Sequence, residues 1–225
     1  MPGVACAGSQ AYEPLSASVR ATLHRSISDE ATPFLAFNNE VDARRWLMAM
    51  SKRLASRITD RLRREEFLVS VHYEAKRAGL DPQLVLGVIQ VESNFRKYAV
   101  SRAGAMGYMQ VMPFWTQLIG RSDDNLFHLR TNLRFGCVIL RHYLDQEKGD
   151  LYRALGRYNG SLGRAEYPNL VVRAWERDWH YATHSTVSVS GASPAPEPHP
   201  RPVRSRHSGI TAAVTAPIST TSHDR

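Results

Sequence analysis

Apolar residues recur every three or four positions along two neighbouring stretches of the chain, the spacing that gathers side chains on one face of a helix. The first stretch, from residue 42 to 58, has an apolar stripe of Ala43, Leu47, Met50, Leu54 and Ile58. The second runs from about residue 60 to 77, with a stripe of Phe67, Leu68, Val71 and Ala75. Each pattern predicts an amphipathic helix with one buried face.

A more apolar stretch follows, and it carries one acidic residue where a core side chain is expected. Asp81 and Pro82 suit the N-cap and the first position of a helix. The apolar stripe of this helix consists of Leu84, Val85, Val88 and Ile89. One further step of four from Val88 reaches Glu92. The pattern therefore predicts a carboxyl group on the buried face, in the last turns of the helix.

A carboxyl group in this position favours its protonated form. Burial of an ionised carboxylate without a partner costs free energy, and the pKa rises in response. The negative end of the helix dipole lies close to Glu92 and acts in the same direction. Glu92 is therefore a candidate proton donor. The ordinary alternative is an amphipathic helix on which Glu92 reaches solvent or pairs with Arg96.

The segment from residue 103 to 111 has the composition of a turn rather than a helix. Gly104 and Gly107 permit backbone conformations that larger residues avoid. Gln110 follows an apolar residue and precedes a helix that Pro113 opens, which indicates an amide held at the edge of a pocket. We expect a small irregular or β-like element here.

The remaining pattern predicts further helices and completes an all-α fold class. The expected segments are residues 114–119, a helix from Thr131 or Asn132 to Gly149, a helix capped by Asp150, and a final segment from Glu166 through Trp179. The stripe that follows Asp150 ends at Tyr158, whose ordinary role would be that of a core aromatic residue.

The composition is that of a soluble globular protein with one or two domains, since 43% of the 225 residues are hydrophobic and 22% are charged. Apolar runs are far shorter than the roughly twenty residues of a membrane-spanning helix, so we expect no integral membrane segment. The net charge of +8 favours an anionic partner: nucleic acid, a membrane surface or an acidic cell-wall polymer. No aromatic or glycine pattern supports a known nucleic-acid module.

Neither the cysteines nor the histidines form a metal-binding pattern. Cys6 and Cys137 are too few for a disulfide framework, and Cys137 fits a small core residue on a helix face. The nine histidines include no HExxH spacing. We therefore expect neither a metal nor another cofactor.

The two ends of the chain differ in composition from its middle. Ser, Thr, Pro, Ala and His dominate residues 184–225, and prolines alternate with other residues from Pro194 to Pro202, which predicts a disordered tail. Residues 1–10 lack the basic start and long apolar core of a secretory signal. We expect residues 1–37 to be an N-terminal segment that combines the remnant of an export signal with a linker.

Three short motifs occur in an order and at a spacing that resemble a known family. They are Glu92–Ser93, Gly107–Gln110 and Tyr158–Asn159. Together they resemble the signature motifs of the family 1 (Slt-type) lytic transglycosylases of the lysozyme superfamily. The similarity covers about Phe67 to Trp179, and it implies a lysozyme-like helical domain.

The resemblance also implies a domain division and a reaction. An Slt-type domain would cover residues 66–183, after a helical extension over residues 38–65. Such enzymes cleave the bond between N-acetylmuramic acid and N-acetylglucosamine in peptidoglycan without consuming water. One glutamate protonates the bridging oxygen, and its carboxylate then takes the proton of the sugar's own 6-hydroxyl, which closes a 1,6-anhydro ring. Glu92 matches that glutamate.

Other residues receive substrate-binding roles from the same resemblance: Ser93, Tyr108, Met109, Gln110, Tyr158, Asn159 and Tyr167. The chain departs from the family pattern in places. The family usually has Leu at Tyr108, Ala at Arg157 and Asp at His128. Tyr108 would stack on a sugar, and Arg157 would meet an acidic peptide stem or face solvent.

The expected partner is the peptidoglycan glycan strand, bound by a monomer in the periplasm or cell envelope. A glycosidase ordinarily uses two carboxyl groups. No second one stands at an obvious partner position, and those nearest in sequence are Asp123, Asp124, Asp145, Asp150 and Glu166. The alternatives are a hydrolytic muramidase of the same superfamily, a glycan-binding or secretion-associated scaffold without activity, and a basic nucleic-acid binder.

Overall fold

The computed structural model describes residues 10–28, 31–121 and 123–182. The helices are α1 (Ala17–Ile27), α2 (Glu40–Leu54), α3 (Arg61–Arg77), α4 (Pro82–Ser93), α5 (Phe114–Ile119), α6 (Leu129–Gln146), α7 (Leu151–Asn159), α8 (Glu166–Ala174) and the π-helical turn η1 (Trp175–Trp179). Within these described ranges the only β-pairing consists of isolated bridges from Met106 to Val100 and to Val111. The predicted all-α fold with a small β-like element is confirmed.

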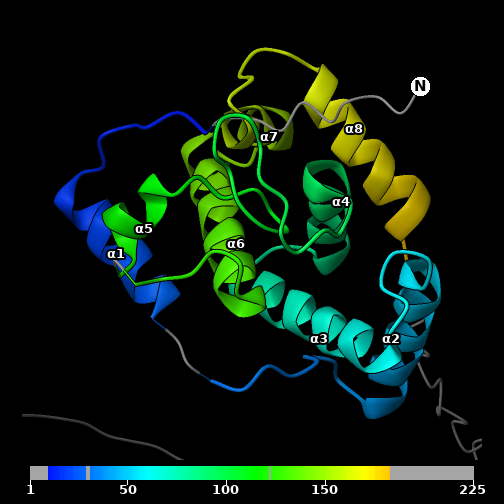
Figure 1. Cartoon of the computed structure of the whole chain (residues 1–225). Helices are drawn as coiled ribbons and strands as arrows, with labels where there is room; N and C mark the ends of the chain where they lie inside the picture. The colour runs from blue at the N-terminus through cyan, green and yellow to red at the C-terminus, as the bar shows by residue number, and fades with distance from the viewer. Residues whose placement is uncertain (1–9, 29–30, 122, 183–225) are drawn as a thin grey trace, which may run out of the picture. The chain divides into compact units, whose positions relative to one another are not determined.

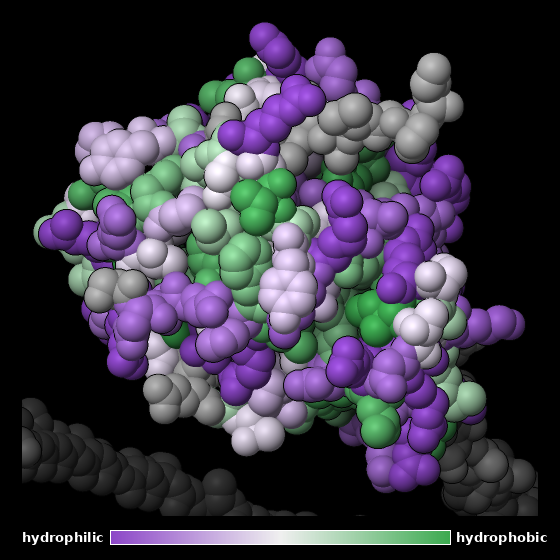
Figure 2. Space-filling view, in the orientation of Figure 1, coloured by the Kyte–Doolittle hydropathy of each residue, from purple (hydrophilic) through white to green (hydrophobic). Residues whose placement is uncertain are grey.

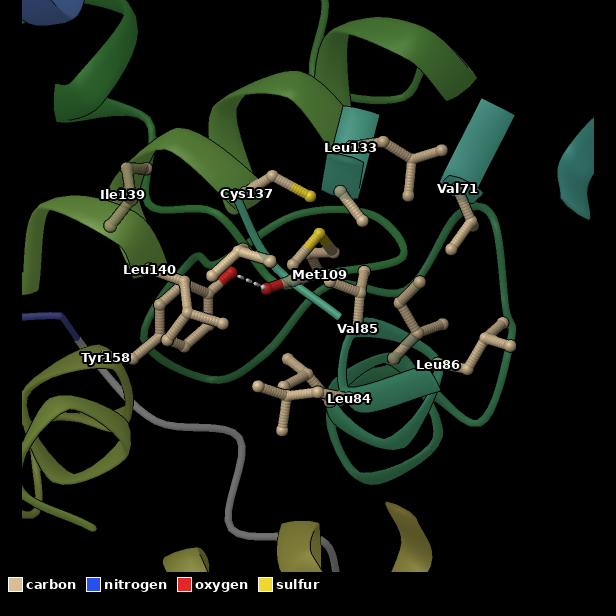
Figure 3. Packing of buried hydrophobic residues seen from close by; sticks show 14 of the residues in the cluster. Val71, Leu84, Val85, Leu86, Met109, Leu133, Cys137, Ile139, Leu140 and Tyr158 are labelled. Carbon is tan, nitrogen blue, oxygen red and sulfur yellow. Dashed lines mark hydrogen bonds between the residues drawn. The ribbon is translucent and has the colours of Figure 1, made fainter. Parts of the chain in front are cut away.

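Helix α4 lies near the middle of the helical body (Figure 1). It packs against α3 and along α8 and η1, while α6 packs against α3 and α7. Most residues of α4 are apolar and buried, on nearly every side of the helix. This composition is typical of a helix inside the core. Figure 3 shows Met109, from the loop after α4, between side chains of α4 and α6. The core therefore holds both α4 and the loop that follows it.

The ends of the helices follow from their capping residues. Asp81 accepts a hydrogen bond from the backbone N–H of Gln83, and Asp150 accepts one from Arg153, as predicted for N-caps. Four predicted bounds differ by a few residues: α2 covers Glu40–Leu54 instead of residues 42–58, and α6 begins at Leu129 and ends at Gln146. Gly149 follows in a left-handed conformation and donates its N–H to Leu144, which closes the last turn.

The N-terminal part of the chain contains a helix that the periodicity did not reveal. Ser16 caps α1, and its residues Leu23 and Ile27 are buried where α1 packs against α5 and α6. Arg134 of α6 donates a hydrogen bond to the carbonyl of Ile27 at 3.0 Å. The expectation of a linker is therefore wrong for residues 17–27, because tertiary contacts with α5 and α6 order them.

Several expectations fall on parts of the chain beyond the described ranges. They are the export-signal remnant in residues 1–9, the position of Cys6, and the disordered tail over residues 184–225. Cys137 is buried on α6, as predicted. Among the described helices, none has the length and apolar character needed to cross a membrane. On the face shown in Figure 2, hydrophobic residues gather near the centre and hydrophilic residues surround them.

Candidate active site

Glu92 occupies the last turn of α4 and is 5% exposed. The hydroxyl of Tyr167, on α8, donates a hydrogen bond to Glu92 Oε1 at 2.6 Å. The other oxygen, Oε2, is buried and has no hydrogen-bond partner among the described residues. Arg96 instead donates its Nε to the carbonyl of Ser93 at 3.0 Å. The alternative of a solvated or arginine-paired Glu92 is therefore wrong.

The surroundings of Glu92 keep its carboxyl group protonated. Burial raises the pKa of Glu92 from its ordinary value of 4.5 to about 8, although the hydrogen bond from Tyr167 acts in the opposite direction. Burial is the larger of the two effects on the pKa. The Tyr167 hydroxyl is a neutral donor, and a neutral donor stabilises a carboxylate less than a cation would. At neutral pH the group therefore holds a proton within the protein interior.

A close approach between α4 and α8 brings Tyr167 to the carboxyl group. A Cβ atom on Gly87 would lie only 3.1 Å from the backbone nitrogen of Trp175 and 3.2 Å from the carbonyl of Val171. The absence of a side chain at Gly87 thus permits the contact between the two helices. Trp175 Nε1 also donates to Asp81 at 3.2 Å, which connects η1 to the N-terminal end of α4.

Gln110 is fixed by its own loop and by the N-terminal segment. Its backbone has φ +51°, and its side-chain amide donates to the carbonyls of Ala99 at 3.1 Å and Gly107 at 3.0 Å. The buried side chain of Gln10 donates to the Gln110 carbonyl at 3.2 Å and accepts from the N–H of Met112 at 3.1 Å. Sequence reasoning missed Gln10, because one hundred residues separate it from its partner.

Asn132 is a second residue that sequence reasoning did not identify as part of the site. It is fully buried on α6, where its Oδ1 accepts a hydrogen bond from the N–H of Met109 at 2.8 Å. Its Nδ2 donates to the carbonyls of Met106 at 2.8 Å and Leu126 at 2.9 Å. Gly107 leaves the space for this side chain, since a Cβ atom there would come within 2.4 Å of Asn132 Nδ2. Asn132 therefore joins the loop to α6.

Two hydroxyl groups from the predicted motifs hold the same loop from other directions. Ser93 donates to the carbonyl of Tyr108 at 2.7 Å. Tyr158 donates to the carbonyl of Met109 at 2.8 Å, the hydrogen bond drawn in Figure 3. Burial and the nearby Glu92 carboxyl raise the pKa of Tyr158, so its phenol stays neutral. The three motifs thus meet around one loop.

The predicted site residues differ in how much surface they present. The Met109 side chain is fully buried against Gly136, and Tyr158 and Asn159 are also buried. Tyr108 is half-buried, and its ring packs 4.9 Å from the ring of Phe67. Of these side chains, only that of Tyr108 presents a substantial surface to solvent.

A hollow of about 480 Å³ opens beside Glu92, between the end of α4 and α8. Among the described residues that line it, Glu92 is the only one with a carboxyl group. Two of the acidic residues nearest in sequence have other partners, since Asp124 accepts from the Arg121 N–H and Asp145 pairs with Arg141. Within the described ranges, no group of three or more His, Cys, Asp or Glu residues is arranged to hold a metal.

Residues 70–171 match the family described as the Transglycosylase SLT domain. The membrane-bound lytic murein transglycosylase C of Glaesserella parasuis is 47% identical over 144 residues, which cover 56% of this chain and 36% of the relative. The same-named protein of Mannheimia succiniciproducens is 31% identical over 137 residues, covering 54% of this chain and 37% of the relative. The transglycosylase of Enterobacteria phage PRD1 is 39% identical over 88 residues, covering 39% and 32%.

The chain spans about a third of the length of these curated relatives. A solved structure of the lytic transglycosylase Slt from Pseudomonas aeruginosa aligns with a TM-score of 0.41 and 21% identity, covering 77% of this chain and 35% of that one. The family match lies within the region whose motifs carried the predicted resemblance. Residues 70–171 of this chain are therefore similar to the transglycosylase SLT domain.

Proposed function

We propose that this chain is a peptidoglycan lytic transglycosylase. The observation that carries the proposal is the protonated, buried carboxyl group of Glu92 at the wall of a hollow, within a region that is similar to the transglycosylase SLT domain. The names of the relatives agree with it, since three of them are transglycosylases and two of those are called murein transglycosylases.

In the proposed reaction Glu92 acts first as an acid. It transfers its proton to the oxygen that bridges N-acetylmuramic acid and N-acetylglucosamine, and the bond from that oxygen to C1 breaks. A pKa of about 8 suits this step, because the group still holds its proton at neutral pH. The departing sugar leaves with a hydroxyl group, and the muramic acid ring becomes electron-deficient at C1.

Glu92 then acts as a base on the same sugar. The carboxylate removes the proton of the 6-hydroxyl, whose oxygen bonds to C1 and closes the 1,6-anhydro ring. This step returns the proton to Glu92 and consumes no water. The Tyr167 hydroxyl, 2.6 Å from Oε1, stabilises the carboxylate between the two steps.

A single carboxyl group favours this intramolecular route over hydrolysis. Hydrolytic glycosidases ordinarily use a second carboxylate as base or nucleophile. Among the described residues lining the hollow, Glu92 has no such companion. An internal hydroxyl group as nucleophile needs no further carboxylate, whereas a hydrolytic muramidase would need to activate water.

The other predicted site residues divide into supports and contacts. Ser93 and Tyr158 each donate a hydrogen bond to the backbone of the loop that carries Gln110, so we propose that they position it. Met109 and Asn159 are buried and belong to the same supporting set. Tyr108, which is half-exposed, remains the predicted sugar contact.

The proposed substrate places the protein in the cell envelope, in agreement with relatives that are named membrane-bound. We propose that it acts there as a monomer on glycan strands. The proposed catalytic domain extends over residues 66–183, with residues 38–65 as a helical extension.

Mass spectrometry of sacculi digested by the protein tests this function. We expect wild-type protein to release muropeptides with 1,6-anhydro ends, and a Glu92→Gln variant to release none above background. Products heavier by one water would instead establish a hydrolytic muramidase. Binding of sacculi without release by either protein would establish a scaffold, and the proposed reaction would be rejected.

A further inference from the structure

The hollow beside Glu92 has arginine side chains on both of its walls. Arg96 follows α4, whereas Arg173 lies on α8 and Arg177 on η1. Leu170, one turn before Arg173, adds an apolar side chain that is 48% exposed. The hollow therefore combines cationic groups with a small apolar surface.

Two of the three arginines have guanidinium groups that remain open to a ligand. Arg177 donates both its Nε and a terminal nitrogen to Asp178, at 2.8 and 3.0 Å. Arg96 uses only its Nε, which donates to the carbonyl of Ser93. Arg173 is exposed and forms no hydrogen bond or ion pair with the residues that the structure describes.

The charge of the hollow favours an anionic ligand. Among its described lining residues, the only carboxyl group belongs to Glu92, and that group is protonated at neutral pH. Arg96 and Arg173 each present terminal N–H groups in the planar arrangement that suits a carboxylate. A carboxylate at either guanidinium group would pair with a cation without displacing an existing ion pair.

We propose that Arg96 and Arg173 bind carboxylate groups of the peptide stem attached to the muramic acid sugar, while Glu92 acts on the glycan bond. This proposal rests on the proposed function. The stem branches from the sugar at which the bond is cleaved, so its first residues lie within reach of a hollow that begins at Glu92. The alanine methyl groups of a stem would pack against Leu170.

A binding experiment with and without stems tests the proposal. Soluble glycan strands would be prepared from sacculi, and one half would be stripped of stems with an N-acetylmuramoyl-alanine amidase. Because this hydrolysis leaves a free lactyl carboxylate on each muramic acid, that carboxylate would then be converted to its neutral methylamide. Affinity would be measured on the Glu92→Gln variant, which removes turnover from the measurement. We expect it to bind stem-bearing strands about five- to tenfold more tightly than stripped strands. Because two exposed ion pairs supply this preference, it would shrink as salt is added.

Arginine variants in the same background identify the groups responsible. Replacing both arginines (Arg96→Ala with Arg173→Ala) would abolish the preference and leave the affinity for stripped strands within about twofold. The control is Arg20→Ala, which removes the same charge from an exposed position on α1 and would keep the preference. Melting temperatures would verify that all variants are folded.

Three results would overturn the proposal. The first is equal affinity of the Glu92→Gln variant for both kinds of strand, and the second is an equal loss on both kinds in the double arginine variant. The third concerns a separate measurement of binding to phosphatidylglycerol vesicles. If the double arginine variant kept the stem preference but lost binding to these vesicles, the arginines would be assigned to a lipid surface. Failure of the proposed function is a separate result, namely no anhydro product from wild-type protein on either strand.

Discussion

Two glutamates are buried on adjacent helices of this protein, and their surroundings are opposite. Glu74 on α3 is 1% exposed, and its carboxylate contacts Arg77 at 3.1 Å, Arg134 at 3.3 Å and Arg130 at 3.6 Å. Glu92 on α4 is nearly as buried, yet the hydroxyl group of Tyr167 is the only hydrogen-bond partner of its carboxyl group among the described residues.

The difference shows that burial by itself does not create a proton donor. Cations around a buried carboxylate favour its charged form, whereas an apolar setting with one hydroxyl group favours its neutral form. Glu74 serves structure, since Arg134 joins it to the carbonyl of Ile27 and Arg130 joins it to that of Ala31. Glu92 has no cation to hold and keeps its proton for the reaction.

The largest effect expected from this comparison is on catalysis. Glu92→Gln should lower the rate of anhydro-sugar release by about 1,000-fold or more, because an amide cannot deliver a proton. The protein should remain folded, since the neutral amide resembles the protonated acid that it replaces. Release rates and melting temperatures check both statements; a variant retaining a tenth of the activity would end the proposed role of Glu92.

The pH dependence of stability should follow the same carboxyl group. Its ordinary pKa is 4.5 and burial raises it to about 8, so between these values the folded protein holds a proton that the unfolded chain has released. The contribution of Glu92 to the unfolding free energy is therefore greatest below pH 4.5 and declines as pH rises towards 8. Activity should fall through about pH 8 as well, because the acid loses its proton.

Urea unfolding of wild-type protein and the Glu92→Gln variant across this range measures the contribution. As pH rises towards 8, the unfolding free energy of wild-type protein should fall increasingly below that of the variant. Near pH 4.5 the two values should be nearly equal. A constant difference across the window would show that the carboxyl group is not titrating there.

Replacement of Glu74 should have the converse effect, on stability rather than on chemistry. Glu74→Gln leaves three arginines near an uncharged amide and should lower the unfolding free energy by about 3 kcal/mol. Its activity per folded molecule should stay within about twofold of wild type. Denaturant unfolding measures the loss, and Glu65→Gln on the same helix, where the side chain is partly exposed, is the matched control. A strong loss of activity in folded Glu74→Gln would erase the contrast.

The smallest expected effect comes from Tyr167→Phe. The hydroxyl group lowers the pKa of Glu92, so its removal should raise that pKa further. The alkaline limb of the activity profile should move upward by about one pH unit or less, with a reduced rate because the carboxylate intermediate loses a hydrogen bond. A profile that moves downward would mean that Tyr167 disfavours the charged form.

Local periodicity predicted much of the fold and the burial of Glu92. The apolar stripe on α4 determines which face packs inward, and Glu92 shares that face because a helix repeats every three to four residues. The caps Asp81 and Asp150 likewise act on neighbouring backbone. The family resemblance contributed the motifs around Gln110 and Tyr158, which meet at one loop.

The parts that escaped prediction depend on partners distant in sequence. Gln10 forms hydrogen bonds with Gln110 and Met112, about one hundred residues away, and no sequence pattern near Gln10 predicts these contacts. Helix α1 has only Leu23 and Ile27 buried, a stripe too short to recognise without its neighbours. The three arginines around Glu74 come from α3 and α6, so its charge partners follow from the packing of these helices.

The missing side chain at Gly87 matters for any comparison among relatives of this protein. An added methyl group would press on backbone atoms of Val171 and Trp175, which cannot rotate aside, and would widen the gap between the two helices. The phenol of Tyr167 would then withdraw from the acid it touches. A relative with alanine at this position would keep every signature motif intact and yet have a longer distance between this phenol and the acid. A comparison of motif residues alone would not distinguish such a relative from this protein.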